Sequence, residues 1–132
     1  MIGVDTNVLL RLYVADDPRQ HEMATVFFAQ RSEESPAYVS LIVLVEFVWS
    51  LTRTYKYDWE RVYVLVTALA TARDIVIERE DIITEAVGLA VETNAGFVDA
   101  IVAGVNAVDG CESTMTFDRK AAGRIPSMEL LS

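Results

Sequence analysis

Residues 1–14 of the chain read MIGVDTNVLLRLYV, and the pattern changes at the fifth residue, Asp5. Residues 2–5 have the apolar composition of a short strand, whereas residues 7–14 place apolar side chains at the spacing of a helix face. This stretch therefore predicts a strand that passes through one acidic residue into a helix.

Short strands and helices alternate in the same way along the rest of the chain, without a linker or a repeat. Strands separated by helices require right-handed crossovers, which make the sheet parallel and cover both of its faces. We therefore expect an α/β fold in one domain, residues 1–132: a three-layer α/β/α sandwich with a central parallel sheet of about five strands. The expected strands are residues 2–5, 37–40, 75–77, 112–116 and 128–131. The expected helices are residues 7–14, 17–29, 41–54, 59–70, a helix capped by Asp81 that ends near residue 94, 97–108 and 118–122.

The composition indicates a protein with its own hydrophobic core and argues against several classes of protein and site. With 132 residues, 52% of them hydrophobic, the chain is long enough to bury its own core. No stretch approaches the roughly 20 apolar residues of a membrane span, and no signal-like segment opens the chain, so we expect a cytoplasmic protein without a membrane partner. One cysteine, Cys111, and one histidine, His21, argue against an internal disulfide, a zinc cluster and a Ser-His-Asp triad.

The net charge of −9, from 20 acidic and 11 basic side chains, favours a basic protein partner over a nucleic acid. Local clusters of basic residues would weaken this argument against nucleic acid. The candidates for such clusters are Arg53 with Lys56, and Arg119, Lys120 and Arg124.

Four carboxylates interrupt apolar segments: Asp5, Glu46, Asp99 and Asp118. Burying an unpaired carboxylate costs several kcal/mol, so acids in core-like segments need a compensating partner. Asp5 and Asp118 follow expected strands, at the sheet edge where parallel sheets bind ligands. Glu46 and Asp99 stand on helices that can reach the same edge, so we expect the four acids to converge on one cleft. A hard cation, Mg²⁺ or Mn²⁺, suits a site made only of carboxylates.

Bound Mg²⁺ keeps several waters, lowers the pKa of one of them and orients it for attack on a phosphodiester. The same residues also have simpler roles open to them. Asp5 and Asp118 are well placed to cap the helices that follow. Thr6, Asn7 and Thr116 fit capping or turn roles as well as a role beside a catalytic site.

Four segments, one around each acid, resemble the acidic motifs of PIN-domain ribonucleases of the VapC branch, the toxins of type II toxin–antitoxin systems. The resemblance covers nearly the whole chain, with the motifs in the family's order and at family-like spacing. The segments are Val4-Asp5-Thr6-Asn7-Val8-Leu9-Leu10-Arg11, Leu44-Val45-Glu46-Phe47-Val48-Trp49, Gly96-Phe97-Val98-Asp99-Ala100-Ile101 and Thr114-Met115-Thr116-Phe117-Asp118-Arg119-Lys120.

This resemblance implies an endoribonuclease that depends on Mg²⁺ or Mn²⁺, forms a homodimer and is inhibited by a VapB-type antitoxin whose tail lies across the active-site groove. It implies an acidic constellation of Asp5, Glu46, Asp99 and Asp118, assisted by hydrogen bonds from Thr6, Asn7 or Thr116. Many relatives carry a further Asp just before the aromatic residue of the third motif. Gly96 occupies that position here, which implies a metal site with fewer ligands.

Two other functions remain open at the level of the sequence. In the first, a non-catalytic module binds a basic peptide or protein in an acidic cleft, which agrees with the net charge of −9. In the second, Asp5 acts as the nucleophile of a phosphoryl-transfer domain. That pattern calls for a second Asp two residues later, where this chain has Asn7. Cleavage of RNA that requires a divalent cation distinguishes the nuclease from both.

Overall fold

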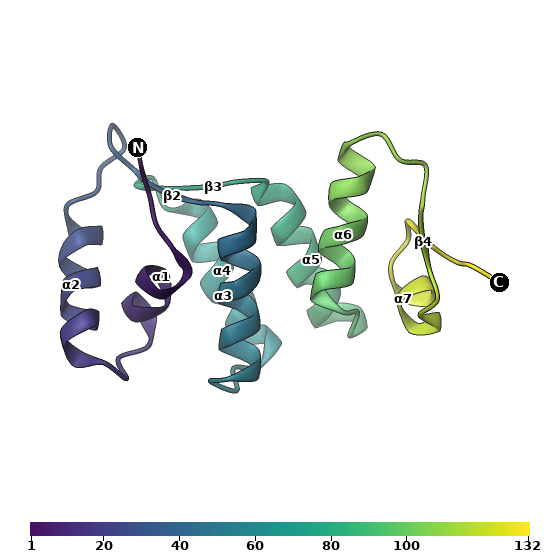
Figure 1. The fold of residues 1–132 in the computed structure, drawn as a ribbon, viewed down its shortest axis with the longest axis horizontal. Helices are drawn as coiled ribbons and strands as arrows, with labels where there is room; N and C mark the ends of the chain where they lie inside the picture. The colour runs from purple at the N-terminus through teal and green to yellow at the C-terminus, as the bar shows by residue number, and fades with distance from the viewer. The chain divides into compact units, whose positions relative to one another are not determined.

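The fold is described from a computed structural model that covers all 132 residues. Helices and strands alternate along the chain, as the colours of Figure 1 show from the N-terminus to the C-terminus. The chain divides into two compact units, which we describe separately: Met1–Asp58 with Val64–Glu78, and Trp59–Tyr63 with Arg79–Ser132. No helix combines the length and the apolar composition that crossing a membrane requires.

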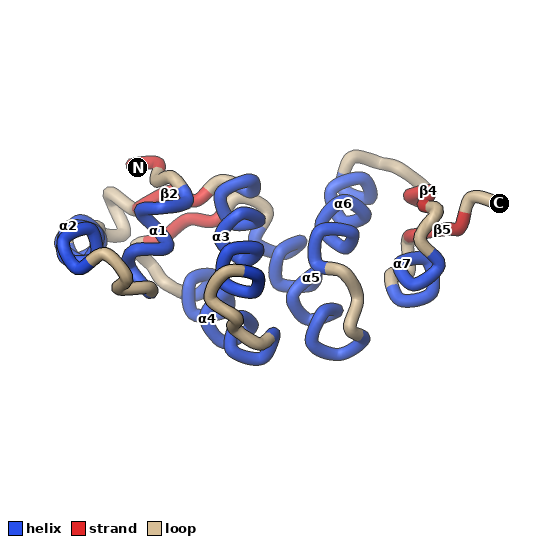
Figure 2. The backbone as a smooth tube through the Cα atoms, turned by 60° about the horizontal axis from the view of Figure 1, so that its bottom comes forward, coloured by secondary structure: helices blue, strands red, loops and turns tan.

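The first unit contains a three-stranded parallel sheet in the order β1-β2-β3, drawn in red in Figure 2. Ala37 of the central strand pairs with Ile2 on one side and with Ile75 on the other. The elements of this unit are β1 (Ile2–Gly3), α1 (Thr6–Tyr13), α2 (Pro18–Ala29), β2 (Ala37–Val39), α3 (Leu41–Arg53), α4 (Trp59–Thr71), whose beginning is counted with the second unit, and β3 (Ile75–Ile77).

Helices of the first unit begin at short polar residues that cap them. The Asp17 carboxylate accepts a hydrogen bond of 3.1 Å from the backbone N–H of Gln20, and Pro18 occupies the first turn of α2. The Ser40 hydroxyl accepts one of 3.4 Å from the backbone N–H of Val43 in α3. Apolar residues at helical spacing then bury one face of α3, and they are Leu44, Phe47, Val48 and Leu51.

The second unit contains two packed helices and a two-stranded parallel ladder, in which Thr114 pairs with Met128. The two helices, α5 and α6, lie side by side in Figures 1 and 2. They approach closely at Gly104, where a Cβ atom would lie 2.7 Å from Cγ2 of Ile82. The elements of this unit are α5 (Glu80–Thr93), α6 (Phe97–Val108), β4 (Thr114–Thr116), α7 (Arg119–Arg124) and β5 (Met128–Leu130).

The structure has five strands, each within its predicted segment, and every strand pair is parallel. They form a ladder of three strands in one unit and a ladder of two in the other. The predicted cap of α5 is wrong, because the residue before this helix is Arg79 in the left-handed conformation (φ 54°), without a side-chain cap. Asp81 lies instead in the first turn, where its charge favours the helix N-terminus.

Candidate functional site

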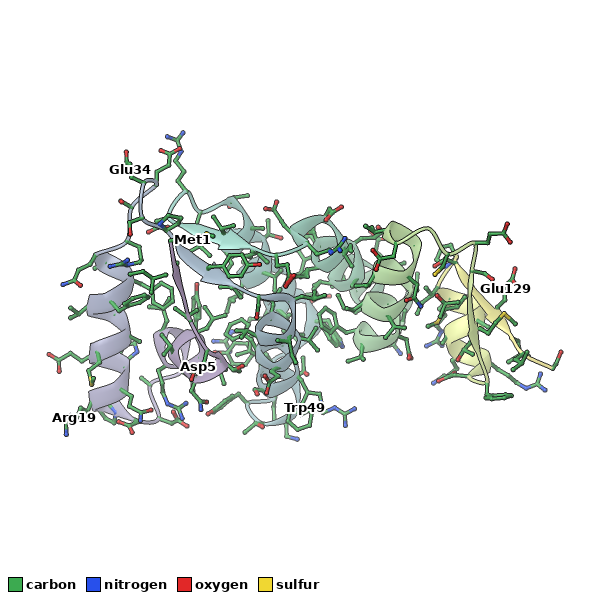
Figure 3. All side chains as sticks on the ribbon, turned by 45° about the horizontal axis from the view of Figure 1, so that its top comes forward. Met1, Asp5, Arg19, Glu34, Trp49 and Glu129 are labelled. Atoms are coloured by element: carbon green, nitrogen blue, oxygen red, sulfur yellow. The ribbon has the colours of Figure 1, made fainter.

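Asp5 lies where the chain passes from β1 into α1, as its label in Figure 3 shows. Its side chain is exposed, and Oδ1 accepts a hydrogen bond of 3.0 Å from the backbone N–H of Val8. The predicted capping role of Asp5 is therefore confirmed. Because the cap uses Oδ1, the second carboxylate oxygen remains available for a ligand.

Glu46 lies close to the start of α1, although 40 residues separate it from Thr6 in the sequence. The Thr6 hydroxyl donates a hydrogen bond of 3.2 Å to Oε1 of Glu46. Glu46 is exposed on α3, because the buried face of that helix is formed by other residues, among them Leu44 and Phe47. The hydrogen bond from Thr6 links Glu46 to the start of α1, where Thr6 directly follows Asp5 in the chain.

Asp99 and Asp118 belong to the second unit and line the same cavity, which has a volume of about 220 Å³. Asp99 lies in the first turn of α6, and Asp118 immediately precedes α7. Lys120 and Arg124 of α7 line the cavity as well, so it combines two carboxylates with two cationic side chains. Such a set offers ligands for a metal ion and for a phosphate group in one place.

Asp118 is held by local hydrogen bonds. Its Oδ1 accepts from the backbone N–H groups of Lys120, at 2.9 Å, and Ala121, at 3.1 Å. Its own backbone N–H donates to the Thr116 hydroxyl at 3.1 Å. Asp118 is therefore the cap of α7, as the sequence also allowed, and Thr116 forms the turn that leads into it.

The premise that the four acids are buried is wrong. Asp5, Glu46 and Asp118 are exposed, and Asp99 is half-buried; no polar or charged residue of the chain is buried. The apolar sequence around Glu46 does not bury it, because α3 buries one face and exposes Glu46 on another. The cost of burying a carboxylate therefore does not argue for a metal ion in this protein.

The acids nevertheless fit a hard cation by their chemistry. No group of three or more His, Cys, Asp or Glu side chains is present that could hold a metal ion. Asp5 and Glu46 belong to one unit and Asp99 and Asp118 to the other, so a single four-acid centre remains a prediction. Mg²⁺ is commonly bound by one or two carboxylates together with phosphate oxygens of a substrate and water, and a carboxylate pair meets that requirement.

The structure adds residues that the motifs did not identify. Gly96 lines the cavity beside Asp99, and the Arg124 side chain donates a hydrogen bond of 2.9 Å from Nη1 to the carbonyl oxygen of Asn94. Asn94 ends α5 in the left-handed conformation (φ 57°). The sequence Asn-Ala-Gly signals the end of a helix, but it does not signal that this turn borders the acids.

A second cavity, of about 430 Å³, adjoins Asp5 in the first unit, and Asn7, Arg11, Gln20 and Phe27 line it. The Arg11 guanidinium donates to Gln20 Oε1 at 3.0 Å and forms an ion pair with the Asp16 carboxylate, also at 3.0 Å. It also donates a hydrogen bond of 3.4 Å to the hydroxyl of Tyr55, which is the main cause of the raised pKa of Arg11.

Comparisons with known proteins identify the family. The sequence profile of the PIN domain matches residues 2–125, which is nearly the whole chain. The crystal structure of Mycobacterium tuberculosis VapC20, a toxin that cleaves the Sarcin-Ricin loop, is similar with 23% sequence identity, 96% of this chain and 98% of that chain covered, and a TM-score of 0.46. No curated protein matches the sequence.

The family match confirms the α/β fold of the PIN type that the four acidic motifs predict. It extends across both compact units and includes all four acids. PIN domains are nucleases that generally use divalent metal ions. This chain is a member of the PIN domain family.

Proposed function

We propose that the protein is a metal-dependent endoribonuclease that acts as the toxin of a toxin–antitoxin pair. The observation that carries the proposal is the cavity of about 220 Å³, where Asp99 and Asp118 lie together with Lys120 and Arg124. A purely acidic cavity would repel a phosphodiester unless metal ions were bound. This one has cationic groups for the phosphate beside carboxylates for the metal.

In this proposal, Asp5, Glu46, Asp99 and Asp118 hold Mg²⁺ or Mn²⁺ through their carboxylate oxygens. The bound ion supplies an activated water and stabilises the negative charge that develops on the phosphate. The Thr6 hydroxyl, at 3.2 Å from Glu46 Oε1, orients that carboxylate. Thr116 and the backbone of α7 orient Asp118. Asn7, which is exposed beside Asp5, supports the same site with a polar side chain.

Lys120 and Arg124 contribute positive charge for the RNA backbone. They stand four residues apart on α7, so they occupy the same side of the helix. The hydrogen bond from Arg124 to the carbonyl of Asn94 holds that guanidinium at the cavity. The net charge of −9 would still oppose RNA at long range, so we expect binding to depend on these local cations.

A VapB-type antitoxin is the proposed protein partner, and the acidic surface of the toxin suits a basic inhibitory segment. We further propose that the protein works as a homodimer in the cytoplasm. A small basic or DNA-binding reading frame immediately upstream of the gene would support the toxin assignment independently of any activity.

The experiment is cleavage of a fluorescently labelled RNA by protein purified free of any partner. We expect cleavage with Mg²⁺ or Mn²⁺ and none after the metal is removed with a chelator. Glu46→Gln keeps the size of the side chain and should eliminate cleavage. Glu92→Gln, a matched change at an exposed glutamate of α5 that is not one of the four acids, should cleave like the wild type.

The rival function makes the opposite prediction in the same assay. A non-catalytic module would bind a basic peptide through its carboxylates and would leave RNA intact with every metal ion. Binding of an arginine-rich peptide that Asp99→Asn weakens, together with the absence of metal-dependent cleavage, would replace the nuclease by this module.

A further inference from the structure

Gly96 leaves a space that the Asp99 carboxylate fills. An ideal Cβ atom built on Gly96 would lie 2.8 Å from Oδ2 of Asp99, closer than a nonbonded carbon and oxygen normally approach. The other atoms near that position, Cγ at 3.6 Å and Cβ at 3.8 Å, also belong to Asp99. The acid side chain thus folds back over the start of α6 toward the residue before the helix.

The backbone does not require a glycine at this position. Gly96 has φ −66° and ψ 126°, an extended conformation that any residue adopts readily. Nor does the helix need a glycine here, because Gly96 provides no side-chain cap, and serine or aspartate at the position before a helix would cap it at least as well. What the glycine permits is the position of the Asp99 carboxylate.

We propose that Gly96 is a positioning residue for Asp99, because its missing side chain lets the carboxylate lie in the cavity shared with Asp118. Gly96 lines that cavity itself, so a side chain there would also occupy space that ligands use. The atom in conflict is the end of a flexible side chain, so a substitution rotates Asp99 rather than unfolding α6.

An aspartate at position 96 would be expected, at first sight, to improve the metal site. Replacing Gly96 by Asp would add a carboxylate beside Asp99 and would seem to complete the metal site. In this chain the new side chain would displace Asp99 and add a repelling charge beside it. Gly96→Asp should therefore weaken metal binding.

This inference rests on the proposed metal site, so the test includes one measurement that needs no metal. The variants are Gly96→Ser, which adds a Cβ and a favourable cap, and Gly96→Asp. The control is Gly88→Ala in α5 of the same unit, where an added Cβ meets no other side chain or neighbouring element within 4 Å. All three variants should keep the far-UV circular dichroism of the wild type.

In metal-free protein, the ¹³Cγ resonance of Asp99 should move in both Gly96 variants and stay in place in Gly88→Ala. Isothermal titration calorimetry with Mn²⁺ should give an affinity roughly 10- to 100-fold lower for Gly96→Ser than for the wild type. In an Asp99→Ala background, the same substitution should change the affinity by less than about twofold, because the side chain that it displaces is absent.

An unchanged Asp99 resonance in Gly96→Ser overturns the positioning role, whatever the metal does. So does an equal loss of affinity with and without the Asp99 carboxylate, or a tighter site in Gly96→Asp. If the wild type binds no Mn²⁺ while the resonance moves as expected, the proposed metal site fails and the positioning of Asp99 by Gly96 stands.

Discussion

The Thr6 hydroxyl donates a hydrogen bond of 3.2 Å to Oε1 of Glu46, joining the first residue of α1 to the middle of α3. Thr6 directly follows Asp5, so this bond brings the second acidic motif to the first. It is also exposed to solvent, where a hydrogen bond contributes little to the stability of the fold. Its importance therefore concerns the orientation of Glu46.

Substitutions of Thr6 can distinguish a role in orienting Glu46 from a role in stabilising the folded protein. Thr6→Val keeps the shape of the side chain and removes the donor, and it should lower the cleavage rate while changing the free energy of unfolding by no more than about 1 kcal/mol. Thr6→Ser restores the donor and should cleave nearly as fast as the wild type. Equal rates for the serine and valine variants would mean that Thr6 does not orient Glu46.

At Asp5 and Asp118, which cap helices, replacement by asparagine should reduce the stability of the protein less than replacement by alanine. Asp118→Asn retains an oxygen that accepts from the backbone N–H groups of Lys120 and Ala121, so the cap survives, whereas Asp118→Ala should destabilise the protein by about 1 kcal/mol. Both variants should lose cleavage. Asp5 should behave in the same way, because its carboxylate accepts a hydrogen bond from the backbone N–H of Val8. Urea unfolding measures the change in stability, and the cleavage assay measures the loss of activity.

Neither Glu46 nor Asp99 is the cap of a helix, so Glu46→Gln and Asp99→Asn should lose cleavage with little change in the free energy of unfolding. Unfolded variants, or variants that cleave normally, would contradict the metal-site assignment.

Divalent cations should stabilise the folded protein, because only the native state holds the carboxylates together. At a concentration of Mg²⁺ or Mn²⁺ about 100 times the dissociation constant, the gain is about 2.7 kcal/mol. A thermal shift assay should show this rise for the wild type and for Glu92→Gln, and a much smaller rise for the double variant of Asp99→Asn with Asp118→Asn. The same rise in all three proteins would place the bound ions elsewhere.

The basic residues near the cavity should affect RNA more than they affect the antitoxin. On an Asp5→Asn background, which prevents cleavage, neutralising Lys120 and Arg124 should weaken RNA binding and lower its log-log salt slope by about 0.7 for each lost phosphate contact. Filter binding across salt concentrations measures the slope.

The same titration should include the other cationic candidates, Arg53, Lys56 and Arg119. Arg124→Lys keeps the charge and tests whether the bond to the carbonyl of Asn94 matters. Antitoxin affinity, measured on the same variants, should change much less. An RNA affinity indifferent to all five residues would refute the proposed division between RNA and antitoxin contacts.

Alkaline pH should destabilise the protein through Tyr13. Tyr13 is partly desolvated, although 37% of its surface is exposed, and this desolvation, followed by the negative charge of Asp74, raises the pKa of Tyr13 above its ordinary value of 10.0. The folded protein therefore retains a proton that the unfolded chain releases, so the free energy of unfolding falls as the pH rises from about 10 through the folded pKa.

Tyr13→Phe removes this titration and keeps the ring that packs against Phe47 at 5.9 Å between centroids. Thermal unfolding from about pH 9 to about pH 11 should show a smaller loss for the variant than for the wild type. Parallel losses would assign the alkaline effect to other groups.

Local sequence determined most of the elements of this protein. The sequence predicts a helix over residues 97–108, and the structure has one with the same bounds, because the apolar spacing and the stop at Asp109-Gly110 are properties of neighbouring residues. The capping roles of Asp5 and Asp118 follow from the same local chemistry. The start of α5 differs from the predicted one, because the residue before the helix is Arg79 in the left-handed conformation, which its side chain does not favour.

Tertiary structure decided the surroundings of the acids. No pattern within a helical turn connects Glu46 with Thr6, or brings Asp99 and Arg124 to one cavity, since both relationships depend on how separate elements pack. Packing also left all four carboxylates out of the core, where the apolar sequence around them had predicted burial. A sequence specifies which residues share a helix face through its period, but the exposure of that face depends on the partners that the whole chain provides.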